Sequence, residues 1–244
     1  MDLWSDYEEL DFAQTALGEL LLRRRRDPAI PGVELFEVKL GDDFLMSSRF
    51  HDSEVALASL GLAKLAGQRP EPWQVVVGGL GLGHTAREAL DDARVGELLV
   101  VEFLRPIIGW HERGLVPLGK GLSEDPRCRF IEADFFAAAA GDDGFDPDQP
   151  KRLFDAILLD IDHAPDNWLG EDNESFYTVA GLQRMSAHLA PQGVFALWSN
   201  DPPAAEFETR LAVVFEQCEA VRVAFANPYT GQESACTVYL GRKP

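Results

Sequence analysis

The sequence has few cysteines, no long apolar run and a shortage of positive charge. Its 244 residues include three cysteines, Cys128, Cys218 and Cys236, at spacings that match no metal site. We therefore expect reduced thiols in a cytoplasmic protein, with no disulfide framework and no metal. No apolar stretch is long enough to span a bilayer, and the acidic first residues are unlike a signal peptide, so we expect no membrane partner.

Positive charge is scarce because 22 Lys and Arg residues face 41 Asp and Glu residues, which gives a net charge of −19 at pH 7. A surface of this sign repels phosphates, so we expect no nucleic acid partner. The charge is compatible with a cationic small molecule. The basic run from Arg23 to Arg26 is interpreted as a solvated strand or turn in preference to a phosphate or partner site.

Glycine is concentrated where a short apolar strand meets a helix. Residues 75–77 are all valine, and a helical pattern begins at His84. Four glycines lie between them: Gly78, Gly79, Gly81 and Gly83. Glycine lets a ligand approach the backbone closely, and the free N–H groups of a helix start favour a hydrogen-bond-accepting ligand. This order predicts a nucleotide site, and the alternative is a tight turn without a ligand.

An acidic residue ends the next strand, about 20 residues beyond the glycines. The apolar run of residues 98–101 follows Glu97 and leads into Glu102 and Phe103. Nucleotide-binding βαβ folds place there the carboxylate that binds ribose hydroxyls. We predict this role for Glu102, and the alternative is a solvated glutamate at the end of a strand.

Strands and helices alternate after residue 70. Earlier, residues 1–17 suggest a loose or short helical lead-in, strands are expected at 20–26, 33–40 and 44–48, and a helix capped by Asp52 or Ser53 should run to about 66. Later strands are expected at 74–79, 97–103, 128–133, 154–160, 194–199, 218–226 and 235–240, with longer helices at 106–117, 174–190 and 204–215. We predict a small β appendage in residues 1–50 and an α/β domain in residues 51–244.

The α/β domain should contain a mostly parallel sheet with helices on both faces. Because no helix separates the last two strands, the last strand should be antiparallel. Ligands bind at the carboxyl ends of such strands. Four acids are predicted to lie at that edge: Glu102, Asp134, Asp160 and Asp162.

With these segments in order, the chain resembles the spermidine synthase family and, more broadly, class I S-adenosylmethionine-dependent methyltransferases. The resemblance covers about residues 18–241 and rests on Val75–Val76–Val77–Gly78–Gly79–Leu80–Gly81, Val101–Glu102, the 125–135 segment DPRCRFIEADF, and the 154–160 segment FDAILLD. It implies a Rossmann-like sheet and a nucleoside-containing cofactor, S-adenosylmethionine or its decarboxylated form. The product would be S-adenosylhomocysteine or methylthioadenosine.

The resemblance also implies residue roles. The four glycines would line the methionine or aminopropyl part of the ligand, and Glu102 would hold the ribose diol. Asp134 would accept a hydrogen bond from the adenine amino group, with Phe103 and Phe135 as ring neighbours or, alternatively, core aromatics. Asp160 would face the amino end of the cofactor.

The chain departs from the family on the acceptor side. The family carries a second aspartate after the fourth strand that deprotonates the attacking amine; here His163 takes that position, one residue after Asp162. Either side chain is a candidate base, so we predict Asp160, Asp162 and His163 as catalytic residues. The family's Tyr and Glu on the helix after the appendage are not evident, since Ala56, Leu57 and Ala58 fall about there.

The sequence therefore predicts a transferase that moves an aminopropyl or methyl group to a small acceptor. The resemblance suggests an amine, with a polyamine as one candidate. The resemblance leaves room for a homodimer. One alternative is a non-catalytic adenosyl-nucleoside-binding protein that has lost the acceptor site. A weaker alternative is a nicotinamide-dependent oxidoreductase, which also uses a glycine turn and a strand-end acid.

Overall fold

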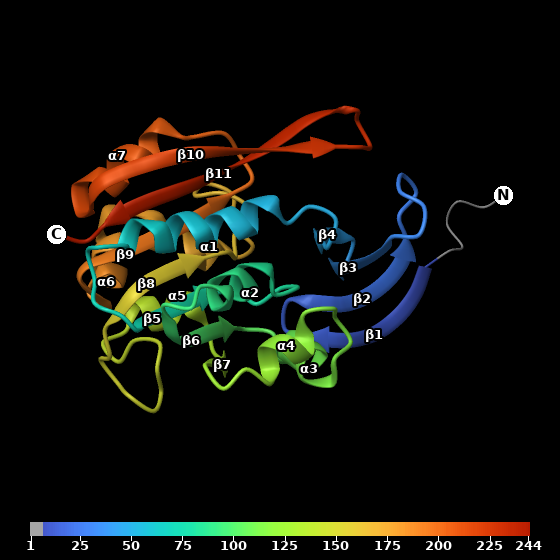
Figure 1. The fold of residues 1–244 in the computed structure, drawn as a ribbon, viewed down its shortest axis with the longest axis horizontal. Coiled ribbons are helices and arrows are strands. Elements are labelled where there is room, and N and C mark those ends of the chain that lie inside the picture. Colours follow the sequence, from blue (N-terminus) through green and yellow to red (C-terminus); the bar gives the residue numbers. More distant parts are fainter. Residues whose placement is uncertain (1–6) are drawn as a thin grey trace.

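The structure, a computed structural model, describes residues 7–244 and contains two β-sheets. A small antiparallel sheet lies beyond the ends of the parallel strands of a larger, helix-covered sheet (Figure 1). The two parts are joined by contacts such as the hydrogen bond from Trp110 Nε1 to Asp11 Oδ2, at 2.7 Å. The predicted class, a Rossmann-like sheet with an N-terminal β appendage, is confirmed.

The small sheet contains four strands in sequential order. They are β1 (Tyr7–Thr15), β2 (Gly18–Arg26), β3 (Glu34–Leu40) and β4 (Asp43–Ser47). The last three were predicted. The prediction of a loose or helical lead-in is wrong for residues 7–15, while residues 1–6 lie outside the described part. A bulge between Glu9 and Asp11 breaks the two-residue alternation that would otherwise have indicated this strand.

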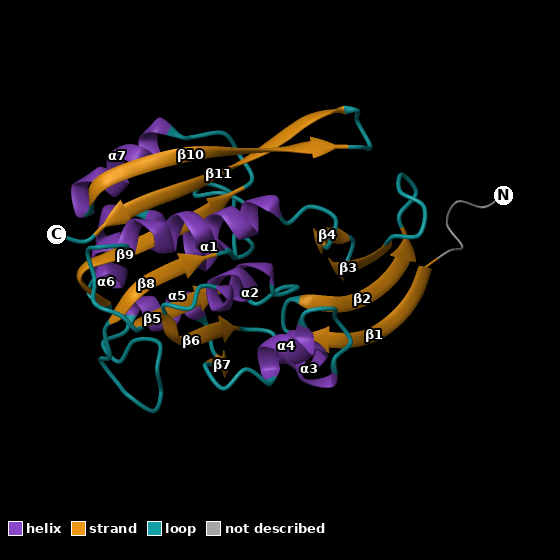
Figure 2. Ribbon diagram, viewed as in Figure 1, coloured by secondary structure: helices purple, strands orange, loops and turns teal. Residues whose placement is uncertain are grey.

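The large sheet has seven strands in the order β10-β11-β9-β8-β5-β6-β7 (Figure 2). Their bounds are β5 (Trp73–Gly78), β6 (Val95–Glu102), β7 (Cys128–Glu132), β8 (Phe154–Leu159), β9 (Leu189–Ser199), β10 (Glu216–Asn227) and β11 (Gln232–Arg242). Strands β5 to β9 pair in parallel, and β11 is antiparallel to both β9 and β10, as predicted. Strand β9 begins five residues earlier than expected, through an irregularity at Gln192, where φ is +64°.

The helices are α1 (Asp52–Leu65), α2 (His84–Asp91), α3 (Arg105–Arg113), α4 (Gly119–Ser123), α5 (Phe135–Ala140), the 3₁₀ helix η1 (Glu171–Tyr177), α6 (Val179–Ser186) and α7 (Ala205–Val214). Helix α3 is shorter than predicted because Gly114 ends it in the left-handed conformation. The helix predicted at 174–190 is divided at Thr178, whose extended backbone and hydroxyl cap α6. The N-cap position of α1 is His51, not Asp52 or Ser53, and its side chain makes no capping hydrogen bond. Among residues 7–244, no helix is long and apolar enough to cross a membrane.

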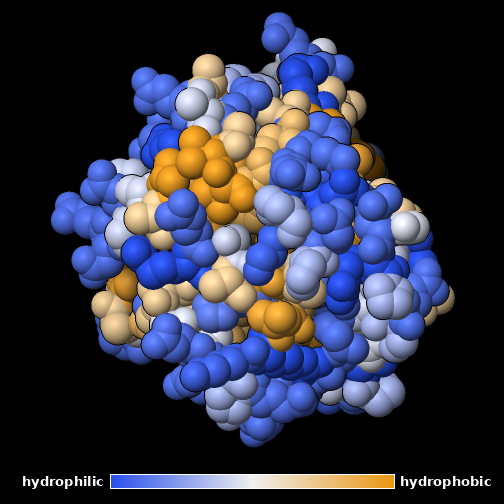
Figure 3. Space-filling model, turned by 90° about the vertical axis from the view of Figure 1, so that its left-hand side faces the viewer, coloured by the Kyte–Doolittle hydropathy of each residue, from blue (hydrophilic) through white to orange (hydrophobic). Residues whose placement is uncertain are grey.

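Two hydrophobic clusters cover the two faces of the large sheet. One contains residues of α1, α2 and α3 and extends into the small sheet through Leu20, Leu22 and Val38, all fully buried. The small sheet is therefore held by the same core as the nearby face of the large sheet. The opposite end of the molecule, where the parallel strands begin, is mostly hydrophilic with separate small hydrophobic areas (Figure 3). The candidate site lies at the other end, where these strands meet the small sheet.

Candidate functional site

The four predicted glycines lie in one turn between β5 and α2. The valines before them are fully buried because β5 pairs with β6 on one side and β8 on the other. Gly79 has φ of +91°, and a Cβ built there would lie 2.2 Å from the carbonyl oxygen of Asp160. Glycine at this position therefore allows the ends of β5 and β8 to approach one another. Gly78 faces the protein core, since its Cβ would meet the ring of Phe135 at 2.6 Å.

Glu102 lies directly beneath this turn. One carboxylate oxygen accepts a hydrogen bond from Leu80 N at 3.0 Å, and the other accepts one from Leu104 N at 2.7 Å. Burial raises the pKa of Glu102, while these backbone N–H groups lower it. The N–H groups of Gly81 and Phe103 also lie close enough to lower the pKa of this carboxyl group. The structure thus brings the predicted glycine turn and the predicted strand-end acid into contact.

Asp160 follows β8 and lies on the other side of the turn. Its Oδ2 accepts a hydrogen bond from Thr85 Oγ1, in the first turn of α2, at 2.7 Å. The same hydroxyl lies 3.4 Å from the carbonyl oxygen of Glu54, in the first turn of α1. Burial, followed by the charge of Asp160, raises the pKa of Glu54 to about 8, and burial raises the pKa of Asp160 to about 6. Two carboxyl groups thus share an environment that disfavours two negative charges.

Sequence reasoning missed Glu54. The sequence predicts no acceptor-side carboxylate on the helix after the small sheet, but Glu54 supplies one, two residues before Ala56. Ser53 Oγ donates to Glu54 Oε2 at 2.9 Å, and Trp198 Nε1 donates to Ser53 Oγ at 2.9 Å. The signal was weak because an acid in the first turn of a helix is common for reasons of helix polarity alone.

Two histidines stack at the starts of the two helices. The rings of His51 and His84 lie 4.4 Å apart at an interplanar angle of 12°. Burial, and then the neighbouring rings of His51 and His111, lower the pKa of His84 to about 4. His84 is therefore neutral at physiological pH and does not neutralise the nearby carboxylates.

Asp162 is buried in the loop after β8 and holds that loop in place. Its oxygens accept hydrogen bonds from Leu169 N at 2.8 Å, Asn173 Nδ2 at 3.0 and 3.1 Å, and Tyr177 OH at 2.8 Å. These donors engage the lone pairs of Asp162, so the geometry does not favour it as a catalytic base, and that role stays a prediction. His163 is half-buried, and its carbonyl oxygen accepts a hydrogen bond from Asn200 N at 2.7 Å.

The three predicted adenine-side residues occupy different environments. Asp134 is exposed and caps α5, with Oδ1 accepting from Phe136 N at 2.8 Å and Ala137 N at 3.1 Å. Phe103 is 49% exposed, so the alternative of a core aromatic is wrong for it. Phe135 is 2% exposed and stacks on Phe145 at 4.9 Å, so it belongs to the core.

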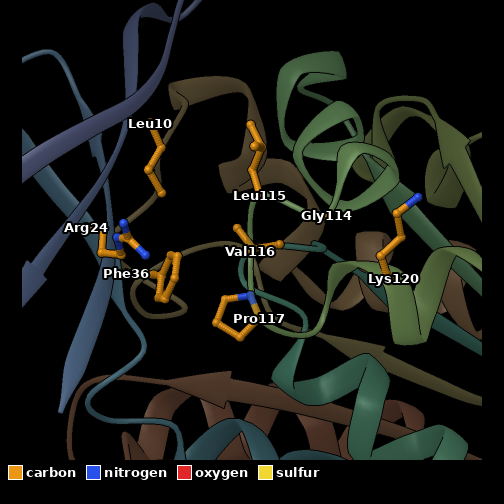
Figure 4. A pocket seen from close by; sticks show the side chains of 8 residues that line it. All are labelled: Leu10, Arg24, Phe36, Gly114, Leu115, Val116, Pro117 and Lys120. Carbon is orange, nitrogen blue, oxygen red and sulfur yellow. The ribbon is translucent and has the colours of Figure 1, made fainter. Parts of the chain in front are cut away.

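A separate cavity of about 320 Å³ lies between the small sheet and the segment after α3 (Figure 4). Leu10, Arg24 and Phe36 face Leu115, Val116 and Pro117 across it. Arg24 is paired with Glu8 at 2.6 Å and Glu34 at 3.3 Å. None of the sequence-predicted site residues lines this cavity.

Comparisons with known proteins support the family resemblance. No family model matches the chain. The chain is similar to polyamine aminopropyltransferase 2 of Pseudomonas aeruginosa, with 28% identity over 158 residues, which cover 62% of the chain and 42% of that protein. The chain therefore matches less than half the length of this curated relative.

Solved structures resemble the chain over most of its length. A spermidine synthase in complex with the transition-state analogue AdoDATO matches 97% of this chain and 74% of that one, with a TM-score of 0.71 and 18% identity. Human methyltransferase-like protein 13 in complex with SAH matches 79% of this chain and 82% of that one, with a TM-score of 0.58 and 19% identity. The resemblance to spermidine synthases that the motifs indicate is confirmed, and the fold is that of class I methyltransferases.

Proposed function

We propose that the protein is a cytoplasmic transferase that binds S-adenosylmethionine or its decarboxylated form and transfers an aminopropyl or methyl group to a small amine acceptor. The observation that carries this proposal is the contact between Glu102 and the glycine turn, with Asp160 on the other side of the same turn. We keep the division into an appendage of residues 1–50 and a transferase domain of residues 51–244 as part of the proposal. A homodimer is compatible with it.

The residues present suit an adenosyl group. Glu102 places a carboxylate beside the glycine turn, and a carboxylate is well matched to the two adjacent hydroxyl donors of a ribose. The first turn of α2 has backbone N–H groups without intrahelical partners. Both capping hydrogen bonds of Asp134 use Oδ1, so Oδ2 is available to accept a hydrogen bond from the adenine amino group.

The acceptor side suits a cationic amine. The negative charge of Asp160 disfavours ionisation of Glu54, and neither side chain forms a salt bridge to a cation within residues 7–244. An ammonium group bound there would replace the proton that the pair holds. The sulfonium of the donor supplies the leaving group, so this chain must align the acceptor and remove its proton. We assign proton removal to Asp160 or His163, since Asp162 is engaged by Tyr177 and Asn173.

A thermal-shift series tests cofactor binding, followed by mass-spectrometric turnover assays with amines and both donors. We expect methylthioadenosine or S-adenosylhomocysteine to raise the melting temperature and NAD to leave it unchanged. Stronger stabilisation by methylthioadenosine would indicate an aminopropyl donor, and stronger stabilisation by S-adenosylhomocysteine would indicate a methyl donor. No stabilisation by any adenosyl compound would contradict the proposal.

A second candidate is a non-catalytic adenosyl-binding protein. The engagement of Asp162 favours it, because one of the three predicted catalytic side chains is already used in the structure of the loop. Turnover in the wild-type protein that is lost in Asp160→Asn or His163→Ala variants would exclude this candidate. Binding without turnover of any amine would support it.

A further inference from the structure

His111 of α3 lies beneath the glycine turn and contacts it directly. The side chain is fully buried, and its Nε2 lies 2.9 Å from the carbonyl oxygen of Gly81. Its Cε1 lies 2.9 Å from the position that a Cβ on Gly83 would take. Only glycine at residue 83 leaves room for this ring.

Burial also fixes the protonation of the ring. It lowers the pKa of His111, so the imidazole is neutral and carries one N–H. Because a carbonyl oxygen faces Nε2, that nitrogen is the donor. Nδ1 is buried without a hydrogen-bond partner in the described part of the chain, as suits the unprotonated nitrogen. His111 therefore donates a hydrogen bond to the Gly81 carbonyl.

This hydrogen bond sets the direction of one peptide group in the turn. In a planar trans peptide, the C=O of Gly81 and the N–H of Leu82 point in opposite directions. Because His111 holds the carbonyl oxygen of Gly81, the Leu82 N–H points away from His111 and α3. No acceptor for this N–H is found within residues 7–244. A backbone N–H without a protein acceptor is free to donate a hydrogen bond to a bound molecule.

Without this hydrogen bond, the Gly81–Leu82 peptide group could rotate easily, because glycines lie on both sides of Leu82. Gly81 has φ of +47° and Gly83 has φ of +93°, so both flanks of Leu82 are glycines that tolerate either orientation. We propose that His111 is a positioning residue, which holds the Gly81–Leu82 peptide so that the Leu82 N–H donates to the bound adenosyl ligand. The inference rests on the proposed function, and it names a residue that does not itself touch the ligand.

Calorimetric titration with methylthioadenosine tests this role in the wild type, His111→Gln and His111→Met. The glutamine side chain retains an N–H donor in a volume close to that of histidine, whereas methionine fills the space without a donor. We expect His111→Met to bind about tenfold more weakly, and His111→Gln to remain within about threefold of the wild type. Circular dichroism confirms that both variants are folded.

Amide hydrogen exchange of the wild type gives a readout that does not depend on the variants. We expect methylthioadenosine to slow the exchange of the Leu82 amide. The proposal is overturned if the ligand leaves that exchange unchanged, if folded His111→Met binds like the wild type, or if folded His111→Gln binds as weakly as His111→Met. If the wild type binds no adenosyl compound, the proposed function itself fails, and His111 has no such role.

Discussion

Replacing Glu54 by glutamine should change how the stability of the protein depends on pH. Glu54 lies in the first turn of α1, with Ser53 Oγ as its described hydrogen-bond donor and Asp160 as its charged neighbour. Glutamine has nearly the same shape as a protonated glutamic acid and still accepts a hydrogen bond from Ser53. The substitution therefore removes the titration and leaves the packing largely intact.

The sign follows from the raised pKa of Glu54. The folded protein keeps a proton that the unfolded chain releases above its ordinary pKa of 4.5, so stability is complete below that pH and is lost as the pH rises towards about 8. A rise of this size corresponds to at most about 5 kcal/mol. Asp160 competes for the same proton, and both groups retain some contact with solvent. We therefore expect the unfolding free energy of the wild type to fall by about 2 kcal/mol over this pH range.

Urea unfolding at about pH 5 and about pH 8.5 measures this difference. We expect Glu54→Gln to match the wild type at the lower pH and to exceed its unfolding free energy by about 2 kcal/mol at the higher pH. The exposed Glu206, in the first turn of α7, provides a control, since Glu206→Gln should leave the pH dependence unchanged. If Glu54→Gln and the wild type lose stability equally between the two pH values, the two carboxyl groups do not share a proton.

Three further substitutions separate binding from stability. Glu102→Gln should weaken methylthioadenosine binding by about 10- to 100-fold in calorimetry, because it removes a charge-assisted acceptor of the ribose; unchanged affinity would contradict that role. Tyr177→Phe should lower the unfolding free energy by about 1 to 3 kcal/mol, since it removes a buried hydrogen-bond donor to Asp162. Its affinity for methylthioadenosine should stay within about threefold of the wild type. A larger loss of affinity at unchanged stability would place Asp162 in the binding site. Asp146→Ala should cost about 3 kcal/mol in urea unfolding because Arg129 and Arg152 lose a buried partner, with no change in ligand affinity.

The order and type of most elements could be predicted from the sequence because they depend on local patterns. Strands β5 and β8 are short apolar runs, and the absence of a helix between β10 and β11 is sufficient to predict the antiparallel last strand. Strand β1 could not be predicted, because its bulge removes the alternation and its pairing with β2 is a tertiary property. The break before α6 depends on one hydroxyl cap at Thr178, which a periodicity analysis does not detect.

The candidate site could be predicted in part, for a related reason. The carboxyl ends of parallel strands lie at one edge of a sheet, so the sequence could place Glu102 and Asp160 at the same edge. Their strands, β6 and β8, lie on either side of β5. Glu54 and His111 lie on helices that reach the turn only through packing, and no local pattern distinguishes them from other helical residues. The hydrogen bonds of Asp162 could not be predicted, because sequence gives the position of a carboxylate along the chain but not the direction in which it points.

The site is therefore assembled from parts of the chain whose relative position depends on one shared core. Glu54 precedes the large sheet in sequence, and it meets Asp160 only because α1 packs against β8 and β9 while the fully buried Leu20 and Leu22 join the small sheet to the same cluster. Loosening that cluster should separate the two carboxyl groups before it unfolds the large sheet. A Leu22→Ala variant should accordingly lower the pKa of Glu54 towards its ordinary value and reduce the pH dependence of stability, in addition to a general loss of about 2 to 4 kcal/mol. Urea unfolding of this variant at the same two pH values tests the argument, and a pH dependence equal to that of the wild type would show that the carboxyl pair is positioned by α1 and β8 alone.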